Sequence, residues 1–345
     1  MPDLSSPLSV GGLTLKNRII MPPMANNLAD ENGAVTDRLL EHYAVRAAGG
    51  PGMIIVEHAY VTPTGRVDPH QLGIWRDDLV PGLGRLADAI HAGGAVAVIQ
   101  ITHGGARCPS SATGRQAVAP SDIRVPGDAE DPRPLTAQEI AEIPGLFAAA
   151  ARRAMDAGFD GVEVHGAHGY LLNEFMSPFT NRRDDEYGGT LENRLRLPRE
   201  VVSAVRAAVT HPAAASRAGV VLYRFCSDDG VQGGLTPDDA AEIAPALASW
   251  GVDMIDCSGG LCGSRPADRT GPGFFIPAAA KIKRAVTVPV SGVGGITDPA
   301  FADSVVRDGS VDAVCVGRAQ LKDPGWAGKA LTALSEPGPA AERLS

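Results

Sequence analysis

The sequence predicts an α/β protein that folds as a single (β/α)8 barrel, the TIM-barrel architecture. Short apolar runs recur along the 345 residues, and each is followed by a segment with a helical pattern. Most of these runs follow a turn rich in Gly or Asp, such as 157–160 or 250–253, where a helix ends and a buried parallel strand begins. About 250 residues form the minimal body of such a barrel, so the chain is long enough.

Eight strands are expected, and helix starts lie between them. Thr136 and Glu139 have the spacing of a capping box, as do Thr236 and Asp239, which have a proline between them in the first helical turn. Helices should then run through the Ala-rich segments 140–157 and 191–209. The expected strands are 18–21, 53–57, 96–100, 161–164, 220–224, 254–257, 288–291 and 313–316.

The chain is longer than a minimal barrel, and three segments account for the surplus. The stretch before Arg18 is expected to cover the barrel floor, and 108–134, rich in Pro, Gly, Ser and Asp, to form an excursion or lid after the third strand. A Pro/Ala-rich tail follows at 336–345. No linker is found, so residues 1–345 are expected to form one domain. The alternative, a doubly wound open sheet, predicts a GxGxxG turn after the first strand, and residues 22–25 are Pro-Pro-Met-Ala.

Composition excludes several classes of function. The net charge of -9 is spread along the chain without a Lys/Arg stripe, which argues against nucleic acid and acidic membranes as partners. Neither a membrane-length apolar segment nor a signal-peptide pattern is found, so we expect a cytoplasmic protein. The five cysteines are scattered, odd in number and free of CxxC spacing, which indicates neither a disulfide framework nor a zinc site.

Polar side chains gather where the expected strands end. His165, His168 and Tyr170 leave the carboxyl end of strand 161–164 together, Gln100 closes the third strand, and Arg224 closes the fifth. Active sites of parallel barrels lie at this end of the strands. Two imidazole donors beside one phenol suit the reduction of a polarised double bond. We therefore interpret the chain as an enzyme.

Glycines follow the last two strands. Gly292 to Gly295 follow the seventh strand, and Gly317-Arg318 follow the eighth. In barrels these two loops commonly bind a phosphate, because glycine lets backbone N–H groups approach the anion and a guanidinium adds charge-assisted bonds. The sequence therefore predicts a phosphate cradle at 293–297 and 317–318.

Several motifs extend over nearly the whole chain and carry a resemblance. They are LKNRIIMPPM at 15–24, HGAHGYLLNEFMSP at 165–178, TNRRDDEYGG at 180–189, LENRLR at 191–196 and GRAQLKDP at 317–324. With these motifs the chain resembles the old yellow enzymes, the FMN-dependent ene-reductases and NAD(P)H:flavin oxidoreductases. It resembles in particular the branch near the barrel of 2,4-dienoyl-CoA reductase.

The resemblance implies FMN as cofactor and assigns its contacts. The flavin would lie against main-chain atoms of Pro23, Met24 and Ala25 and against His165. At its pyrimidine edge it would meet Gln100 and His58, Arg224 would stabilise the charge of the reduced ring, and the phosphate would be held by Gly294, Gly295, Gly317 and Arg318.

The resemblance also implies the reaction. Hydride from NADH or NADPH would pass through the flavin to the β-carbon of an enone-like substrate. His165 and His168 would donate hydrogen bonds to the substrate's carbonyl oxygen, and Tyr170 would protonate the α-carbon. Relatives form dimers and higher assemblies, so the resemblance also implies association of this chain with copies of itself.

Alternatives remain for the function and for individual histidines. The flavin could serve a dehydrogenase or amine-oxidising reaction, or the barrel could be a non-redox lyase or ligand-binding module that retains phosphate binding. The HxxH pair lacks a third ligand of the HExxH type, so no metal is expected. His58 and His103 could instead be structural and bond neighbouring backbone.

Overall fold

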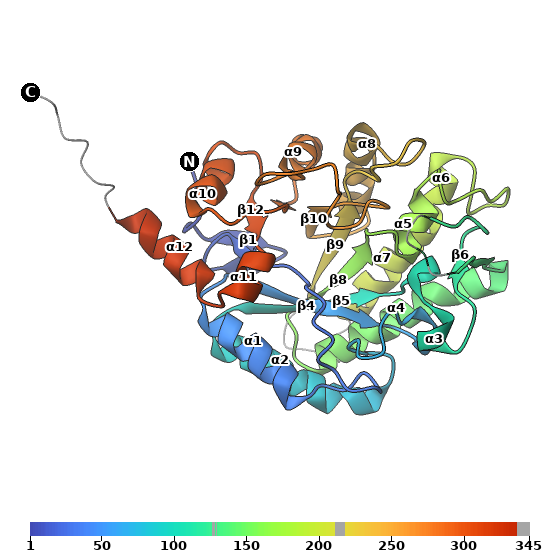
Figure 1. The fold of residues 1–345 in the computed structure, drawn as a ribbon, viewed down its shortest axis with the longest axis horizontal. Coiled ribbons are helices and arrows are strands. Elements are labelled where there is room, and N and C mark those ends of the chain that lie inside the picture. Colours follow the sequence, from blue (N-terminus) through green and yellow to red (C-terminus); the bar gives the residue numbers. More distant parts are fainter. Residues whose placement is uncertain (126–127, 129, 211–217, 337–345) are drawn as a thin grey trace, which may run out of the picture.

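A computed structural model describes residues 1–125, 128, 130–210 and 218–336. Eight parallel strands close into a barrel, and their order around it follows the chain until the last strand pairs with the first through Val314 and Ile19. This confirms the predicted (β/α)8 fold (Figure 1). The strands are β3 (Ile19–Met21), β4 (Met53–Tyr60), β5 (Val96–Thr102), β8 (Gly161–Gly166), β9 (Val220–Cys226), β10 (Met254–Ser258), β11 (Val290–Gly292) and β12 (Ala313–Cys315).

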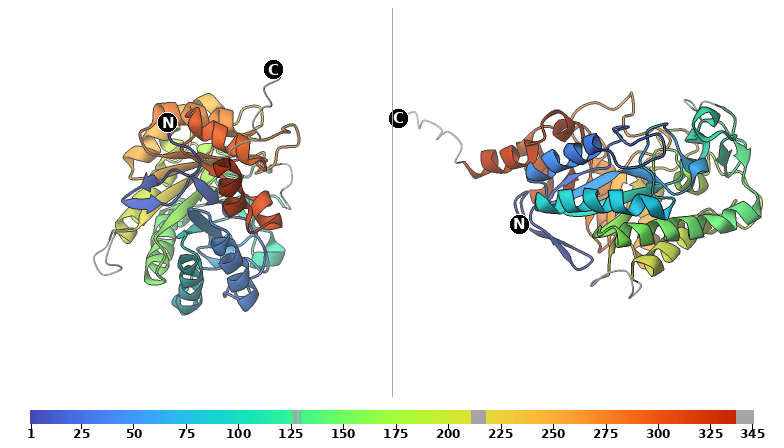
Figure 2. Two further views of the ribbon diagram at one scale, coloured as in Figure 1. Left: turned by 90° about the vertical axis from the view of Figure 1, so that its left-hand side faces the viewer. Right: turned by 90° about the horizontal axis from the view of Figure 1, so that it is seen from below.

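Helices surround the barrel, as the end-on view in Figure 2 shows. In the longest of them, positions 140, 143, 147, 150, 151 and 154 form a buried apolar stripe with helical spacing. The longer helices are α1 (Asp37–Ala48), α2 (Val80–Ala92), α4 (Ala137–Asp156), α7 (Arg196–Val209), α8 (Pro237–Ser249), α9 (Ile276–Ala285), α10 (Pro299–Arg307) and α12 (Trp326–Ser335). The shorter ones are α3 (Ser110–Thr113), α5 (Leu171–Met176), α6 (Leu191–Arg194) and α11 (Arg318–Lys322), with 3-10 turns at Pro63–Gly65, Asp77–Leu79 and Gly105–Arg107.

Both predicted capping boxes are confirmed, and one predicted helix is divided. Thr136 and Thr236 each cap a helix whose third residue bonds back to the threonine. The single helix expected at 191–209 is instead α6 and α7, which meet at Leu195. Pro198 explains the division, because proline lacks the N–H that a helix interior needs and is tolerated in a first turn. A new helix therefore starts just before it.

The residues before Arg18 cover the barrel floor, as predicted. They form an antiparallel hairpin of β1 (Leu8–Val10) and β2 (Leu13–Leu15), which turns at two glycines with positive φ. Its apolar side chains join one buried cluster with Met53, Val98 and Met254 from the amino-terminal halves of the barrel strands. Burial of these side chains holds the hairpin in place.

The excursion after the third strand lies where it was expected. Residues 108–134 contain α3, β6 (Val118–Ala119) and β7 (Arg133–Pro134), and the last two pair with each other. Positions 126, 127 and 129, like the tail residues 337–345, lie outside the described residues. Among the helices of the described chain, none has the length and apolarity that a membrane span requires.

Candidate active site

The three residues expected to act on the substrate lie together at the carboxyl end of β8. His165 belongs to this strand, Tyr170 precedes α5, and His168 between them has a left-handed backbone with φ 61°. The ring centroids of His165 and Tyr170 are 4.6 Å apart, those of His165 and His168 are 5.0 Å apart, and those of His168 and Tyr170 are 6.5 Å apart. The tight turn at His168 therefore brings the three predicted catalytic side chains into one group.

The two imidazoles form a hydrogen-bonded chain. The N–H of Ala167 donates to Nδ1 of His165 at 3.3 Å, and Nε2 of His165 lies 3.2 Å from Nδ1 of His168. Nε2 of His168 then lies 2.8 Å from Oγ of Ser258. Burial lowers the pKa of both histidines well below 6.5, and neighbouring positive charge adds to the effect. Both rings are therefore neutral at neutral pH, and each has a single N–H.

Tyr170 is a protonated phenol at neutral pH. Burial raises its pKa above the ordinary value of 10.0. Within the described part of the chain, no residue forms a hydrogen bond with its hydroxyl group. The phenol is thus a proton donor that remains available to a ligand.

His58 lies beside this group, whereas His103 does not join it. The ring of His58 is 5.6 Å from that of Tyr170, and its Nδ1 is 2.6 Å from Nε2 of Gln71. Burial lowers the pKa of His58 to about 4, so the ring is neutral at neutral pH. Because Nε2 of Gln71 donates to Nδ1 of His58, the single proton of this ring lies on its Nε2. Nδ1 of His103 accepts the N–H of Gly105 at 3.1 Å, which favours a structural role for this histidine.

The barrel interior below the histidines is polar because strand register aligns polar residues. Gln100 pairs with Glu163 across β5 and β8, and Arg224 pairs with His165 on one side and with Asp256 on the other. Register partners on parallel strands face the same side of the sheet. Nε2 of Gln100 donates to Glu163 at 2.7 Å, and Nη1 of Arg224 donates to Asp256 at 2.7 Å.

The charges of this interior compensate one another. Asp256 also accepts a hydrogen bond from Ser291 at 2.8 Å. Burial raises the pKa of Glu163, and the nearby carboxylate of Asp256 raises it further. Burial by itself would lower the pKa of Arg224, but the negative charge nearby, chiefly that of Asp256, outweighs it. The arrangement keeps Arg224 charged at its contact with Asp256, and the raised pKa of Glu163 favours its protonated form.

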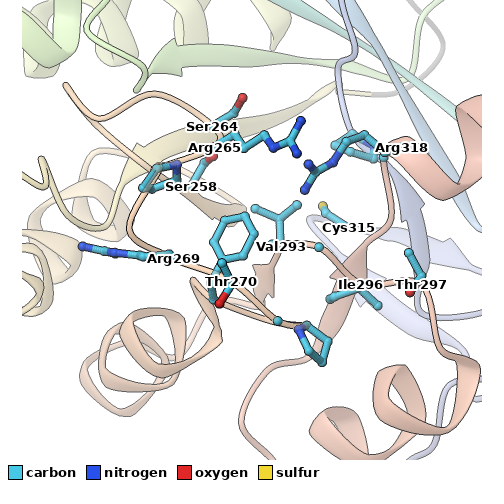
Figure 3. A pocket seen from close by; sticks show the side chains of 18 of the residues that line it. Ser258, Ser264, Arg265, Arg269, Thr270, Val293, Ile296, Thr297, Cys315 and Arg318 are labelled. Carbon is cyan, nitrogen blue, oxygen red and sulfur yellow. The ribbon is translucent and has the colours of Figure 1, made fainter. Parts of the chain in front are cut away.

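A cavity of about 950 Å³ opens at the carboxyl ends of β3, β10, β11 and β12. Arg265 and Arg318 line it, and Figure 3 shows their side chains extending toward each other. Ser258 lines the cavity and also bonds His168, so it connects the cavity with the histidine group. The predicted cofactor residues that line the cavity are Met24, Arg224, Gly294, Gly295, Gly317 and Arg318, whereas Pro23, Ala25, His58, Gln100 and His165 are not part of its lining.

The glycine end of the cavity fits a phosphate. Gly294 and Gly295 have φ of 127° and 63°, and an added Cβ on either would lie 2.8 Å from a neighbouring backbone atom. The N–H groups of these glycines, of Gly317 and of Arg318 donate to no acceptor among the described residues. Arg318 and Arg265 likewise have no carboxylate partner within the described ranges. Free N–H groups beside unpaired guanidinium groups are the donors that a phosphate requires.

Sequence reasoning missed Ser258 and Arg265. The strand-end rule would have found Ser258 if it had been applied to the sixth strand, since this residue directly follows the expected strand 254–257. Arg265 lies in the loop after β10, and no spacing in the sequence indicates that this loop turns toward the phosphate end.

The loop that carries Met24 and Ala25 is hydrogen-bonded to the side chain of Glu57, whose pKa is raised. The N–H of Asn26 donates to Oε2 of Glu57 at 3.0 Å. Burial raises the pKa of Glu57 from 4.5 to about 7. Because the folded state binds this proton more tightly than the unfolded state, the stabilisation is complete below pH 4.5 and is lost as pH rises through 7.

We therefore expect Glu57→Gln to change how stability depends on pH. The amide cannot ionise, so between about pH 4.5 and pH 8 the variant should gain roughly 3 kcal/mol relative to the wild type. Urea unfolding of both proteins across this range measures the difference. A constant difference in unfolding free energy at all pH values would contradict the shifted pKa.

A barrel with free backbone N–H groups after its last two strands, and with neutral imidazoles and a phenol after the fourth, fits the class of cofactor-dependent oxidoreductases. Residues 3–336 match the NADH:flavin oxidoreductase / NADH oxidase family, and the chain belongs to this family. It is an NAD(P)H-dependent FMN oxidoreductase, and its resemblance to the old yellow enzymes is confirmed.

Individual relatives differ in length. The chain is 42% identical to an NADH oxidase of Thermoanaerobacter brockii over 95% of its own length and 50% of the relative, so it spans half of that protein. It is 39% identical to an NADPH dehydrogenase of Halalkalibacterium halodurans, with 94% of this chain and 92% of the relative covered. The solved old yellow enzyme homologue from Zymomonas mobilis aligns with a TM-score of 0.82 and 29% identity, over 97% of this chain and 94% of the other.

Proposed function

We propose that the protein reduces carbon–carbon double bonds conjugated to a carbonyl group, with NADH or NADPH as the source of hydride. The grouping of His165, His168 and Tyr170 supports this most strongly, with ring centroids 4.6 to 6.5 Å apart. The two neutral imidazoles can donate hydrogen bonds to the carbonyl oxygen of such a substrate, and the protonated phenol can give a proton to its α-carbon.

The residues that hold FMN in this proposal are those of the cavity and the polar interior. Gly294, Gly295, Gly317 and Arg318 would bind the phosphate with their free donors. Pro23, Met24, Ala25, His58 and Gln100 would surround the ring together with His165, and Arg224 would face its pyrimidine side. When bound, FMN accepts hydride from the nicotinamide and delivers it to the substrate.

The protein's own residues orient and protonate the substrate. The imidazole N–H groups of His165 and His168 would donate to the carbonyl oxygen, where negative charge develops as the β-carbon is attacked. One preorganised donor to such an oxygen contributes roughly 3 kcal/mol to transition-state stabilisation. Tyr170 then gives its hydroxyl proton to the α-carbon, and solvent restores that proton.

An anaerobic two-step experiment tests the proposal. Purified protein loaded with FMN should lose its yellow colour on addition of NADPH or NADH, and it should regain the colour when cyclohex-2-enone is added. A protein that takes up no FMN would instead favour a non-redox phosphate-binding barrel. Bleaching without recolouring by the enone would favour a flavin dehydrogenase or amine-oxidising enzyme.

Removal of Arg318 should weaken FMN binding through the phosphate alone. A charge-assisted hydrogen bond contributes about 1.5–3 kcal/mol, so Arg318→Ala should raise the dissociation constant of FMN about ten- to a hundredfold. Arg265→Ala tests the facing guanidinium in the same way. Quenching of flavin fluorescence by the apoprotein measures binding. Riboflavin, which lacks the phosphate, should bind all three proteins equally, and an equal loss of riboflavin binding would contradict this role.

A further inference from the structure

Ser258 occupies a fixed place at the top of the barrel interior. It is the last residue of β10 and is fully buried. Its carbonyl oxygen accepts both the N–H and the Oγ–H of Ser227 at 2.8 Å. The N–H of His168 donates to the carbonyl oxygen of Gly259 at 3.0 Å. The backbones that carry Ser258 and His168 are thus tied together, and their side chains meet at 2.8 Å.

The hydrogen bonds determine which nitrogen of each histidine has the proton. Nδ1 of His165 accepts the N–H of Ala167, so its single proton lies on Nε2 and points toward Nδ1 of His168. Without a ligand, Nδ1 of His168 must accept this bond. His168 then has its own proton on Nε2, where it donates to Oγ of Ser258. In this state His168 offers no N–H to a substrate.

A carbonyl oxygen between the two rings needs the opposite arrangement at His168. Only a proton on Nδ1 lets His168 donate to the oxygen that also accepts from Nε2 of His165. Nε2 of His168 then needs a donor, and the hydroxyl of Ser258 is the group within reach. A hydroxyl can accept in the first state and donate in the second by rotation about its C–O bond. Backbone carbonyls and carboxylates cannot do so.

We propose that Ser258 is a positioning residue that sets the tautomer of His168 for substrate binding. The idea rests on the proposed function, since it requires a substrate oxygen between His165 and His168. The change of tautomer releases a proton from Nε2 to solvent and takes one from solvent at Nδ1, so the ring stays neutral. The hydroxyl of Ser258 rotates from acceptor to donor, and both imidazoles then donate to the same oxygen.

Ser258→Ala should impair the step with the enone substrate. We expect kcat/KM for cyclohex-2-enone to fall about tenfold, as for loss of one neutral hydrogen bond. Ser227→Ala is the matched control, because it removes a buried hydroxyl that bonds the backbone of Ser258 and does not touch the imidazole. It should leave the rate with enone unchanged.

The tautomer itself can be observed by nitrogen NMR of FMN-loaded protein labelled at histidine. Saturation with cyclohexanone, a ketone that cannot be reduced at a C=C bond, should move the His168 proton from Nε2 to Nδ1 in the wild type but not in Ser258→Ala. If the alanine variant does not fold, Ser258→Cys retains the volume and replaces the hydroxyl by a weak donor. An unchanged tautomer in wild type, or the same change in the variant, overturns the proposal. Failure of the wild type to be reoxidised by the enone would instead contradict the proposed function.

Discussion

Tyr170→Phe is expected to slow reoxidation of the reduced flavin by cyclohex-2-enone by roughly two to four powers of ten, the usual contribution of a positioned general acid. The phenol is protonated because burial raises its pKa, and its hydroxyl is bonded to no other described residue. Phenylalanine keeps the ring and its packing beside His165 and removes only the hydroxyl group that carries the proton. Reduction of the flavin by NADPH needs no such proton and should keep its rate.

Anaerobic stopped-flow measurement of the two half-reactions separates these effects. Tyr223→Phe is a suitable control, because this buried tyrosine lies in β9 and, among the described residues, its hydroxyl hydrogen-bonds the sulfur of Met176 at 3.8 Å and no catalytic group. The control should slow neither half-reaction. Equal slowing of both half-reactions by Tyr170→Phe, or slowing of neither, would exclude Tyr170 as the acid.

Arg224→Met is expected to lower the stability of the apoprotein by about 3–5 kcal/mol, the range for breaking a buried ion pair. The side chains of Arg224 and Asp256 are 5% and 1% exposed, and their charged atoms are 2.7 Å apart. Methionine fills similar volume without charge, so Asp256 would remain as an unpaired buried carboxylate beside Glu163. Chemical unfolding without FMN measures the fold alone, free of any loss of cofactor contacts.

A double variant distinguishes loss of the ion pair from loss of packing. Arg224→Met combined with Asp256→Asn removes both charges and should recover most of the lost stability. Lys329→Met breaks an exposed pair with Asp323, at 73% and 40% exposure, and should cost less than about 1 kcal/mol. If Arg224→Met costs no more than Lys329→Met, the buried charges do not contribute as we infer.

The fold was largely predictable because its signals are local. Each of these signals affects the backbone only within a few residues. They are the apolar runs, the turn glycines and the capping threonines Thr136 and Thr236, and the structure contains the elements that they predict. The error at 191–209 was local as well, since Pro198 was present in the sequence but was not weighed. The strands β4 and β5 extend beyond their predicted ends at 57 and 100. Their ends depend on pairing with neighbouring strands, and the sequence of one strand does not show which residues of another strand it will pair with.

The candidate site was only partly predictable. The strand-end rule placed His165, Gln100 and Arg224 at one end of the barrel, and the glycine loops indicated the phosphate cradle that the cavity now supports. The bond between His165 and His168 and the partner of His168 on β10 could not be predicted, because they depend on side-chain directions across two strands.

By itself, the sequence determined the barrel, the end at which its chemistry lies and the residue types available there, because periodicity and turn chemistry act over short distances. Only the tertiary structure decided which charged groups form ion pairs and which side chains form hydrogen bonds with one another. Asp256 meets Arg224 and Ser258 meets His168 across separations of 32 and 90 residues. The closure of eight strands creates a buried interior in which desolvation makes the histidines neutral and each hydrogen bond specific.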